Sequence, residues 1–278
     1  MREEHDSIFD YAPESTVTTV KVEFEAEDVK MEPEEEVEIK EKKKPSRTEV
    51  FTTEDGTKLF RSFKIGRCPH ESGLQVYKKA IHSFKPGISI LVGCNGSGKS
   101  TAFSFIQDIL KENDIPVFKY SNLTEGGNTA RESALFYGNL NLLAEQITSS
   151  EGENIVINIG TMAQKLGSFV GRNINKGEIW ILLDAIDSGL SIDYIEEVKD
   201  FLHSQLIDKL TDIDLYILIS TNNYELCIGE ACYNVQDCQY IEIDSYETFK
   251  KIVKKTRANK SKFIKKYNDL KKRKPELF

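Results

Sequence analysis

The segment LVGCNGSGKST (91–101) decides the fold. Its residues Gly93, Gly98, Lys99 and Ser100 satisfy the pattern GxxxxGK[ST]. An apolar run, GISILVG (87–93), leads into it, and STAFSFIQDILKEN (100–113) follows with apolar residues at helical spacing. A glycine-rich loop between a strand and a helix is the context in which this pattern binds phosphate. The segment therefore predicts a phosphate-binding loop.

The residue types in this loop suit a nucleotide with Mg²⁺. Glycines let successive backbone N–H groups turn toward an anion, and the helix N-terminus adds partial positive charge. Lys99 is expected to reach the β- and γ-phosphates, and the Ser100 hydroxyl is expected to ligate Mg²⁺. The predicted nucleotide-binding set is Gly93, Asn95, Gly96, Ser97, Gly98, Lys99, Ser100 and Thr101.

Further segments around the loop alternate between strand and helix. Strands are predicted over 115–120, 178–185 and 214–221, and helices over 139–147, 154–171 and 191–210. A β-hairpin is predicted over 49–66, because Asp55-Gly56 separates two strand-like runs. The predicted fold is an α/β P-loop NTPase. Its mostly parallel central sheet is flanked by helices, with an antiparallel β part near the N-terminus.

The longer string GCNGSGKST resembles the phosphate loop of ABC-type ATPases, GxNGxGKST, a superfamily of transporter motors, SMC proteins and recombination ATPases. The SMC-like segment IDSGLS (186–191) and Glu153 favour the non-transporter, SMC- and recombination-like members. The segment ILLDAIDSGLS (181–191) resembles the Walker B strand and D-loop of that family. The resemblance implies that Asp184 holds Mg²⁺. It also implies a water-polarising glutamate at the next position, where this chain has Ala185. Asp187, three residues beyond Asp184, is a candidate substitute.

A methyl group cannot orient or deprotonate a water, so Ala185 predicts impaired hydrolysis. Two explanations are open: natural loss of the glutamate, or an engineered Glu→Ala change that traps the nucleotide. The family pattern around Ala185 is intact, which favours engineering.

Two more motifs of the family have weaker counterparts. SSEGEN (149–154) resembles the LSGGQ-like signature, so that Ser150, Gly152 and Glu153 would meet the γ-phosphate held by an opposite subunit. The alternative is a helix capping box. Asn222 stands at the switch position, where the family usually has a histidine; it can hydrogen-bond but cannot carry positive charge.

Two sites of the family have only tentative assignments. Asn122 or Asn128 is the candidate for the Q-loop residue. Tyr77 or Phe63 is the candidate for stacking on adenine, and core packing is the alternative for both aromatic residues.

Charge divides the chain into three parts. Residues 1–50 hold 16 acidic and 8 basic residues, so the net charge of −8 resides there. We expect a disordered acidic tail over 1–47, an ABC-type ATPase domain over 48–248 and a basic helical extension over 249–278. Residues 249–274 contain thirteen Lys and Arg and one acidic residue. This stretch, Lys250 to Lys274, predicts a DNA contact; a membrane surface, an acidic partner or a solvated helix are the alternatives.

Composition narrows the class of protein further. No apolar run approaches ~20 residues, the N-terminus does not resemble a signal peptide, and the five cysteines lack zinc-site spacing. We therefore expect a cytoplasmic protein with reduced thiols and no membrane partner, whose acidic tail could bind another protein.

The functional prediction follows from the motifs. It is an ATP-gated homodimeric clamp or switch in phage or bacterial DNA metabolism. Alternatives are a nucleotide-sensing module without hydrolysis and a transporter motor.

Overall fold

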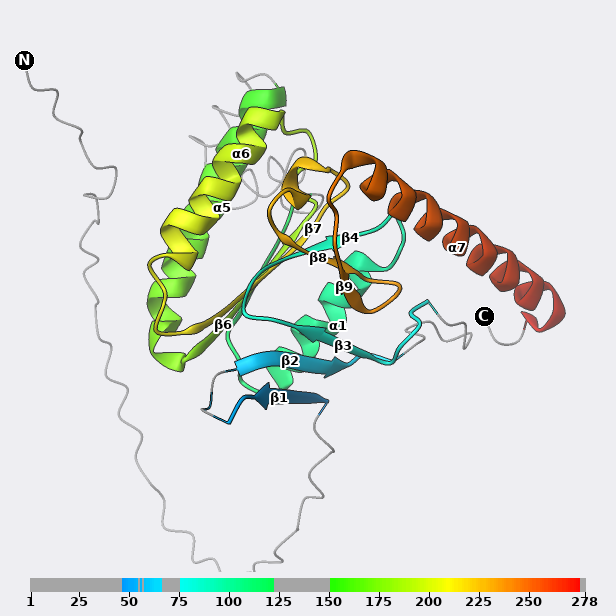
Figure 1. Cartoon of the computed structure of the whole chain (residues 1–278), viewed down its shortest axis with the longest axis horizontal. Helices are drawn as coiled ribbons and strands as arrows, with labels where there is room; N and C mark the ends of the chain where they lie inside the picture. Colours follow the sequence, from blue (N-terminus) through cyan, green and yellow to red (C-terminus); the bar gives the residue numbers. More distant parts are fainter. Residues whose placement is uncertain (1–46, 55, 57, 67–75, 123–150, 276–278) are drawn as a thin grey trace, which may run out of the picture. The chain divides into compact units, whose positions relative to one another are not determined.

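A six-stranded sheet in the order β5-β6-β7-β4-β8-β9 forms the centre of the protein (Figure 1). The computed structural model describes residues 47–54, 56, 58–66, 76–122 and 151–275. Five strands are parallel and only β9 runs antiparallel to its neighbour, β8. The strands are β4 (Gly87–Val92), β5 (Val117–Ser121), β6 (Glu178–Asp184), β7 (Asp214–Ser220), β8 (Ala231–Asn234) and β9 (Gln239–Ile241).

A smaller antiparallel sheet is formed by β1 (Thr48–Thr52), β2 (Lys58–Lys64) and β3 (Ile81–Phe84). The hairpin predicted over 49–66 is confirmed as β1 and β2. Sequence reasoning did not predict β3, β8 or β9, each of which has only three or four residues. The predicted class is thereby confirmed as α/β, with a mostly parallel sheet, flanking helices and an antiparallel part.

Four longer helices accompany the sheets in the described part of the chain. They are α1 (Lys99–Glu112), α5 (Glu151–Asn173), α6 (Ile192–Phe201) and α7 (Tyr246–Arg273). A π-helical segment, Leu202–Ile207, continues α6, so the helix predicted over 191–210 is confirmed with an irregular end. Two short 3₁₀ helices cover Ile174–Lys176 and Glu225–Cys227. The helix predicted over 139–147 lies outside the described residues.

Both faces of the central sheet are buried, which explains why its strands read as continuous apolar runs. In β6, Ile179, Ile181 and Leu183 belong to the core that includes residues of α5 and α6. Trp180 and Leu182 belong to the opposite core, with α1 and the antiparallel sheet. The parallel strand β7 lies between β6 and β4, and this order decides which residues meet at the carboxyl ends of the strands.

The C-terminal helix α7 packs against the core with its first half and is exposed along its second half. Its first half contributes Phe249 to the core and buries Thr256. Its 28 residues correspond to a length of about 42 Å, and its second half extends away from the sheet (Figure 1). The helix begins at Tyr246, three residues before the basic segment predicted from Phe249 onward.

Candidate nucleotide-binding site

The predicted phosphate loop joins β4 to α1, which confirms the predicted order of strand, loop and helix. At Gly98, φ is 99°, and a Cβ would lie 2.9 Å from the Tyr77 ring. A Cβ at Gly93 would lie 2.6 Å from the Ser97 hydroxyl oxygen. These positions therefore require glycine both for backbone conformation and for space. The helix starts at Lys99, so its first N–H groups face the loop.

Lys99 is held at the centre of this loop. Its Nζ donates to the carbonyl oxygens of Gly93 at 2.8 Å and Cys94 at 3.4 Å, and to Oδ1 of Asn222 at 3.0 Å. Burial lowers the pKa of Lys99 below its ordinary value, and the nearby Cys94, Asp187 and Asp184 oppose this shift. All three ammonium donors are thus directed to protein oxygens. A phosphate bound to Lys99 would have to replace one of them, and the contact with Asn222 is the most readily exchanged because that side chain is exposed.

Asp184 ends β6 in the same cavity as Ser100. The cavity has a volume of about 460 Å³, and Ser100, Thr101, Asp184, Ala185, Asp187 and Asn222 are among the residues that line it. The Ser220 hydroxyl at the end of β7 donates to Oδ1 of Asp184 and accepts from the Ala185 N–H at 3.1 Å. This contact fixes the carboxylate at the mouth of the cavity.

The two predicted metal residues fit Mg²⁺. Both offer oxygen atoms to one cavity, and Mg²⁺ in nucleotide sites takes one or two protein ligands and completes its shell with phosphates and water. Among the described residues, no group of three or more His, Cys, Asp or Glu side chains is arranged to hold a metal ion. A site shared with a nucleotide does not need such a group.

Ala185 follows β6 in a left-handed conformation, with φ of 54°. Its side chain lines the cavity and offers no polar atom. Asp187 lies on the same turn. Its Oδ2 accepts hydrogen bonds from Oγ1 of Thr221 at 2.8 Å and from the N–H of Asn222 at 3.0 Å. Its Oδ1 is buried and has no hydrogen-bond partner among the described residues. Asp187 therefore lines the cavity and has one buried oxygen without a hydrogen bond among the described residues.

The tentative Q-loop residue Asn122 lies beside this turn. Its Nδ2 donates to the carbonyl oxygen of Ser188 at 3.0 Å, so it contacts the loop that follows Asp184. Asn128 and the signature residue Ser150 lie outside the described residues. Gly152 and Glu153 lie in the first turn of α5, which begins at Glu151, directly after Ser150.

The two candidate adenine-stacking residues have different positions. Phe63 is fully buried and packs against Trp180, so the alternative of core packing holds for it. Tyr77 is 1% exposed, and its hydroxyl donates to the carbonyl oxygen of Gly98 at 2.7 Å. Tyr77 therefore packs against Gly98 of the predicted phosphate loop and stabilises it by this hydrogen bond.

Helix α7 also belongs to the site, which sequence reasoning did not foresee. The Thr256 hydroxyl accepts from the backbone N–H of Cys94 at 2.9 Å, and Nζ of Lys260 donates to the carbonyl oxygen of Asn95 at 2.8 Å. These residues are more than 160 positions apart in the sequence. The sequence signal for this helix was that apolar residues are interleaved with the lysines of the basic segment, some of them at helical spacing.

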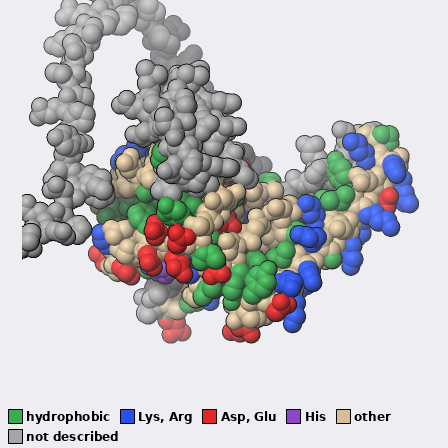
Figure 2. All heavy atoms as spheres, turned by 90° about the horizontal axis from the view of Figure 1, so that it is seen from above, with side chains coloured by type: hydrophobic (Ala, Val, Ile, Leu, Met, Phe, Trp, Pro, Cys, Tyr) green, Lys and Arg blue, Asp and Glu red, His purple; other side chains and the backbone are tan. Residues whose placement is uncertain are grey.

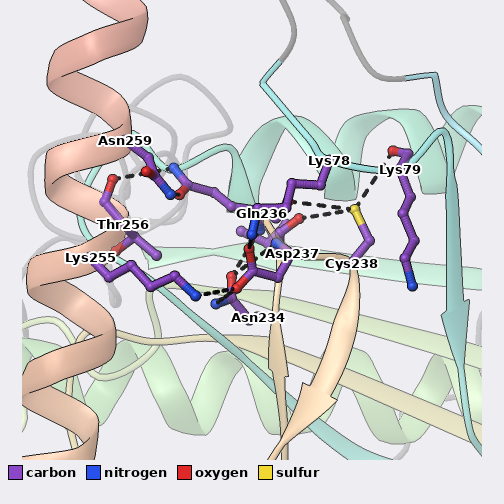
Figure 3. A network of polar contacts seen from close by, with 10 residues as sticks. Lys78, Lys79, Asn234, Gln236, Asp237, Cys238, Lys255, Thr256 and Asn259 are labelled. Atoms are coloured by element: carbon purple, nitrogen blue, oxygen red, sulfur yellow. Dashed lines mark hydrogen bonds and ion pairs between the residues drawn. The ribbon is translucent and has the colours of Figure 1, made fainter.

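A polar network anchors α7 to the loop that connects β8 to β9 (Figure 3). Lys255 and Lys78 form ion pairs with the carboxylate of Asp237, at 2.9 and 2.5 Å. Although burial raises the pKa of Asp237, the hydrogen bonds from the two lysines bring it below its ordinary value. Asn259 donates to Oε1 of Gln236 at 3.2 Å. Several independent contacts thus fix the first half of α7 beside the predicted phosphate loop.

A second cavity adjoins the first across the phosphate loop. Its volume is about 450 Å³, and it shares Gly96, Gly98 and Thr101 with the first cavity. Its lining includes Val76 and Tyr77, which precede β3, and Asn259, Lys260 and Phe263 of α7.

Comparisons with known proteins add no family to this description. A scan against models of protein families and a search of curated proteins gave no match to this chain. None of the described helices is long and apolar enough to span a membrane. The four described cysteines, Cys94, Cys227, Cys232 and Cys238, are buried and not disulfide-bonded.

Proposed function

We propose that this protein is an ABC-type ATPase that binds ATP with Mg²⁺ and acts as an ATP-gated dimeric clamp. The observation that carries the proposal is the shared cavity lined by Lys99, Ser100 and Asp184. The cavity brings an ammonium, a hydroxyl and a carboxylate together at the N-terminus of α1, from segments more than 80 residues apart in the sequence. That set suits a nucleotide triphosphate with a divalent cation.

The chemistry would be hydrolysis of the γ-phosphate by water. Bound Mg²⁺ would neutralise charge on the β- and γ-phosphates. Lys99 would exchange its contact with Asn222 for a phosphate oxygen. Ala185 cannot polarise the water, so we expect slow turnover in this chain. Asp187 is the remaining carboxylate on that turn and lines the cavity. Its Oδ1 is buried, so the side chain would have to turn toward the cavity to orient the water or accept its proton.

Equilibrium binding of ATP with Mg²⁺ tests the nucleotide site. Lys99→Ala should weaken binding by roughly 10- to 100-fold, because a hydrogen bond to a charged group is lost. The matched control is Lys111→Ala, which removes an exposed lysine from the last turn of the same helix. Equal ATP affinity for the chain and Lys99→Ala would reject the site.

The clamp is tested by sedimentation with and without ATP. The chain should dimerise with ATP and Mg²⁺, and slow turnover should keep the dimer intact during the experiment. Ser150→Arg should prevent dimerisation while leaving ATP binding unchanged, because the signature serine would act on the nucleotide of the opposite subunit. A monomer at saturating ATP would contradict the clamp.

A nucleic-acid contact is a second element of the proposal, and the charge of α7 favours it. Figure 2 shows blue Lys and Arg side chains along the protruding helix. Lys265, Lys266, Lys271, Lys272 and Arg273 are all exposed there. Duplex DNA should bind with an affinity that falls steeply with salt. Lys265→Glu with Lys266→Glu should weaken this binding, whereas Lys111→Glu on α1 should not. Equal affinity of all three proteins would exclude α7 as the contact.

A further inference from the structure

We infer that the second cavity is the nucleobase site, that α7 forms its base-reading wall, and that the site selects adenine. This inference rests on the proposed nucleotide site and extends it to the part of the ligand beyond the phosphates. The two cavities share Gly96, Gly98 and Thr101, so a nucleotide with its phosphates on the loop directs its sugar and base into the second cavity. The volume of about 450 Å³ is in the range of small-ligand pockets.

The wall formed by α7 has a regular pattern. Thr256, Asn259, Lys260 and Phe263 recur at spacings of three and four, so they lie on one side of the helix. Thr256 bonds the loop backbone, Lys260 bonds Asn95, and Asn259 and Phe263 line the cavity beyond them. One side of the helix therefore contacts the loop through Thr256 and Lys260 and lines the cavity through Asn259 and Phe263.

Phe263 is the aromatic residue best placed for stacking. It is half-buried and lines the cavity. Tyr77, the other aromatic residue of the lining, has almost no exposed surface, and its hydroxyl donates to the carbonyl oxygen of Gly98. A base entering the cavity would therefore stack on Phe263 of α7. Lys260, which lines the second cavity and donates to the carbonyl oxygen of Asn95, adds a cation beside the loop.

The hydrogen-bond network fixes the orientation of the Asn259 amide. The carbonyl oxygen of Thr256 can only accept, so Gln236 presents its Nε2 to it, at 3.4 Å. Oε1 of Gln236 then accepts from Nδ2 of Asn259, which leaves Oδ1 of Asn259 and one N–H for a ligand. An acceptor beside a donor matches N6 and N7 of adenine, whereas guanine presents acceptors at both positions. This pairing predicts adenine over guanine.

Competition binding with ATP, GTP and inorganic tripolyphosphate tests the inference, since tripolyphosphate carries the anion without the base. Phe263→Ala should weaken ATP binding by roughly 5- to 100-fold and leave tripolyphosphate binding unchanged. Phe263→Tyr should restore ATP affinity. Asn259→Ala should reduce the preference for ATP over GTP by roughly 5- to 100-fold. Ile264→Ala is the matched control, because Ile264 is 44% exposed on the same helix.

The outcomes separate this inference from the proposed function. If Lys99→Ala leaves tripolyphosphate binding unchanged, the phosphate loop is not the anion site, and the proposed function fails with the inference. If Lys99→Ala abolishes tripolyphosphate binding but Phe263→Ala does not alter ATP affinity, the inference alone is overturned. Equal affinities of the wild-type chain for ATP, GTP and tripolyphosphate would also overturn it. Urea unfolding of each variant confirms that it is folded.

Discussion

Thr256→Val should loosen the phosphate loop, because valine keeps the shape of threonine but cannot accept a hydrogen bond. In the protein, Oγ1 of Thr256 accepts from the N–H of Cys94 at 2.9 Å and donates to the carbonyl oxygen of Val253 at 3.0 Å. Thr256 is 1% exposed and Cys94 is 4% exposed, so water cannot readily replace the lost partner. An unsatisfied buried donor costs about 1–3 kcal/mol of unfolding free energy. ATP affinity should fall as well, because the freed N–H belongs to the loop.

Thr256→Ser is the matched control for this change. It keeps the hydroxyl and removes only the buried methyl group, at a cost of about 1 kcal/mol. Urea unfolding measures the free energy of both variants, and isothermal titration with ATP and Mg²⁺ measures their affinities. We expect Thr256→Ser to bind ATP like the original chain and Thr256→Val to bind it more weakly. If Thr256→Val matches the original chain in both measurements, α7 does not support the loop and this reasoning is wrong.

Two further predictions concern buried polar residues of the strands around the site. Burial lowers the pKa of His82 from 6.5 to about 4, so the folded state keeps this residue neutral. Below pH 6.5 the unfolded chain binds a proton that the folded state does not, so stability present above pH 6.5 should be lost as pH falls toward 4. At pH 5 the original chain should have lost about 2 kcal/mol of unfolding free energy through His82, and His82→Phe should not show this loss. Urea unfolding of both proteins at pH 7.5 and pH 5 measures it, and equal pH dependence of the two would contradict the prediction. The Arg61–Glu178 ion pair, at 2.5 Å, joins β2 to β6, and both side chains are at most 10% exposed. Arg61→Met should cost about 3–5 kcal/mol because the buried Glu178 carboxylate, which keeps a hydrogen bond from Nε1 of Trp180 at 2.7 Å, loses its cationic partner. Glu178→Gln in the same chain should recover part of this loss. Additive losses in that double variant would show that the two residues are not coupled.

The sequence predicted the elements with long, uniform patterns. β6 and β7 are seven-residue strands that are almost wholly buried, and α1 follows a loop whose glycines are dictated by close contacts. The short strands β3, β8 and β9 could not be predicted, because three or four residues do not establish a period. Their pairing depends on the larger sheet, since β8 is held by β4 and β9 by β8.

The candidate site was predictable as a set of residues but not as an arrangement. Lys99, Ser100 and Asp184 could be named from their local patterns. The contacts of Ser220 with Asp184 and of Asn222 with Lys99 depend on β7 lying between β4 and β6, and local patterns do not fix strand order. Thr256 and Lys260 contact the loop from α7. The main feature of this helix in the sequence is its positive charge, which does not predict contact with the loop. The dependence of the site on α7 therefore required the structure.

Steady-state ATP hydrolysis tests the central claim most directly. The chain would be measured beside Ala185→Glu, with Lys99→Ala as the blank. The proposed ATPase predicts that Ala185→Glu hydrolyses ATP well above the blank and well above the unaltered chain, because a carboxylate would then directly follow Asp184. If neither protein exceeds the blank while both bind ATP, the claim of hydrolysis is contradicted, and the protein is a nucleotide-dependent switch without turnover.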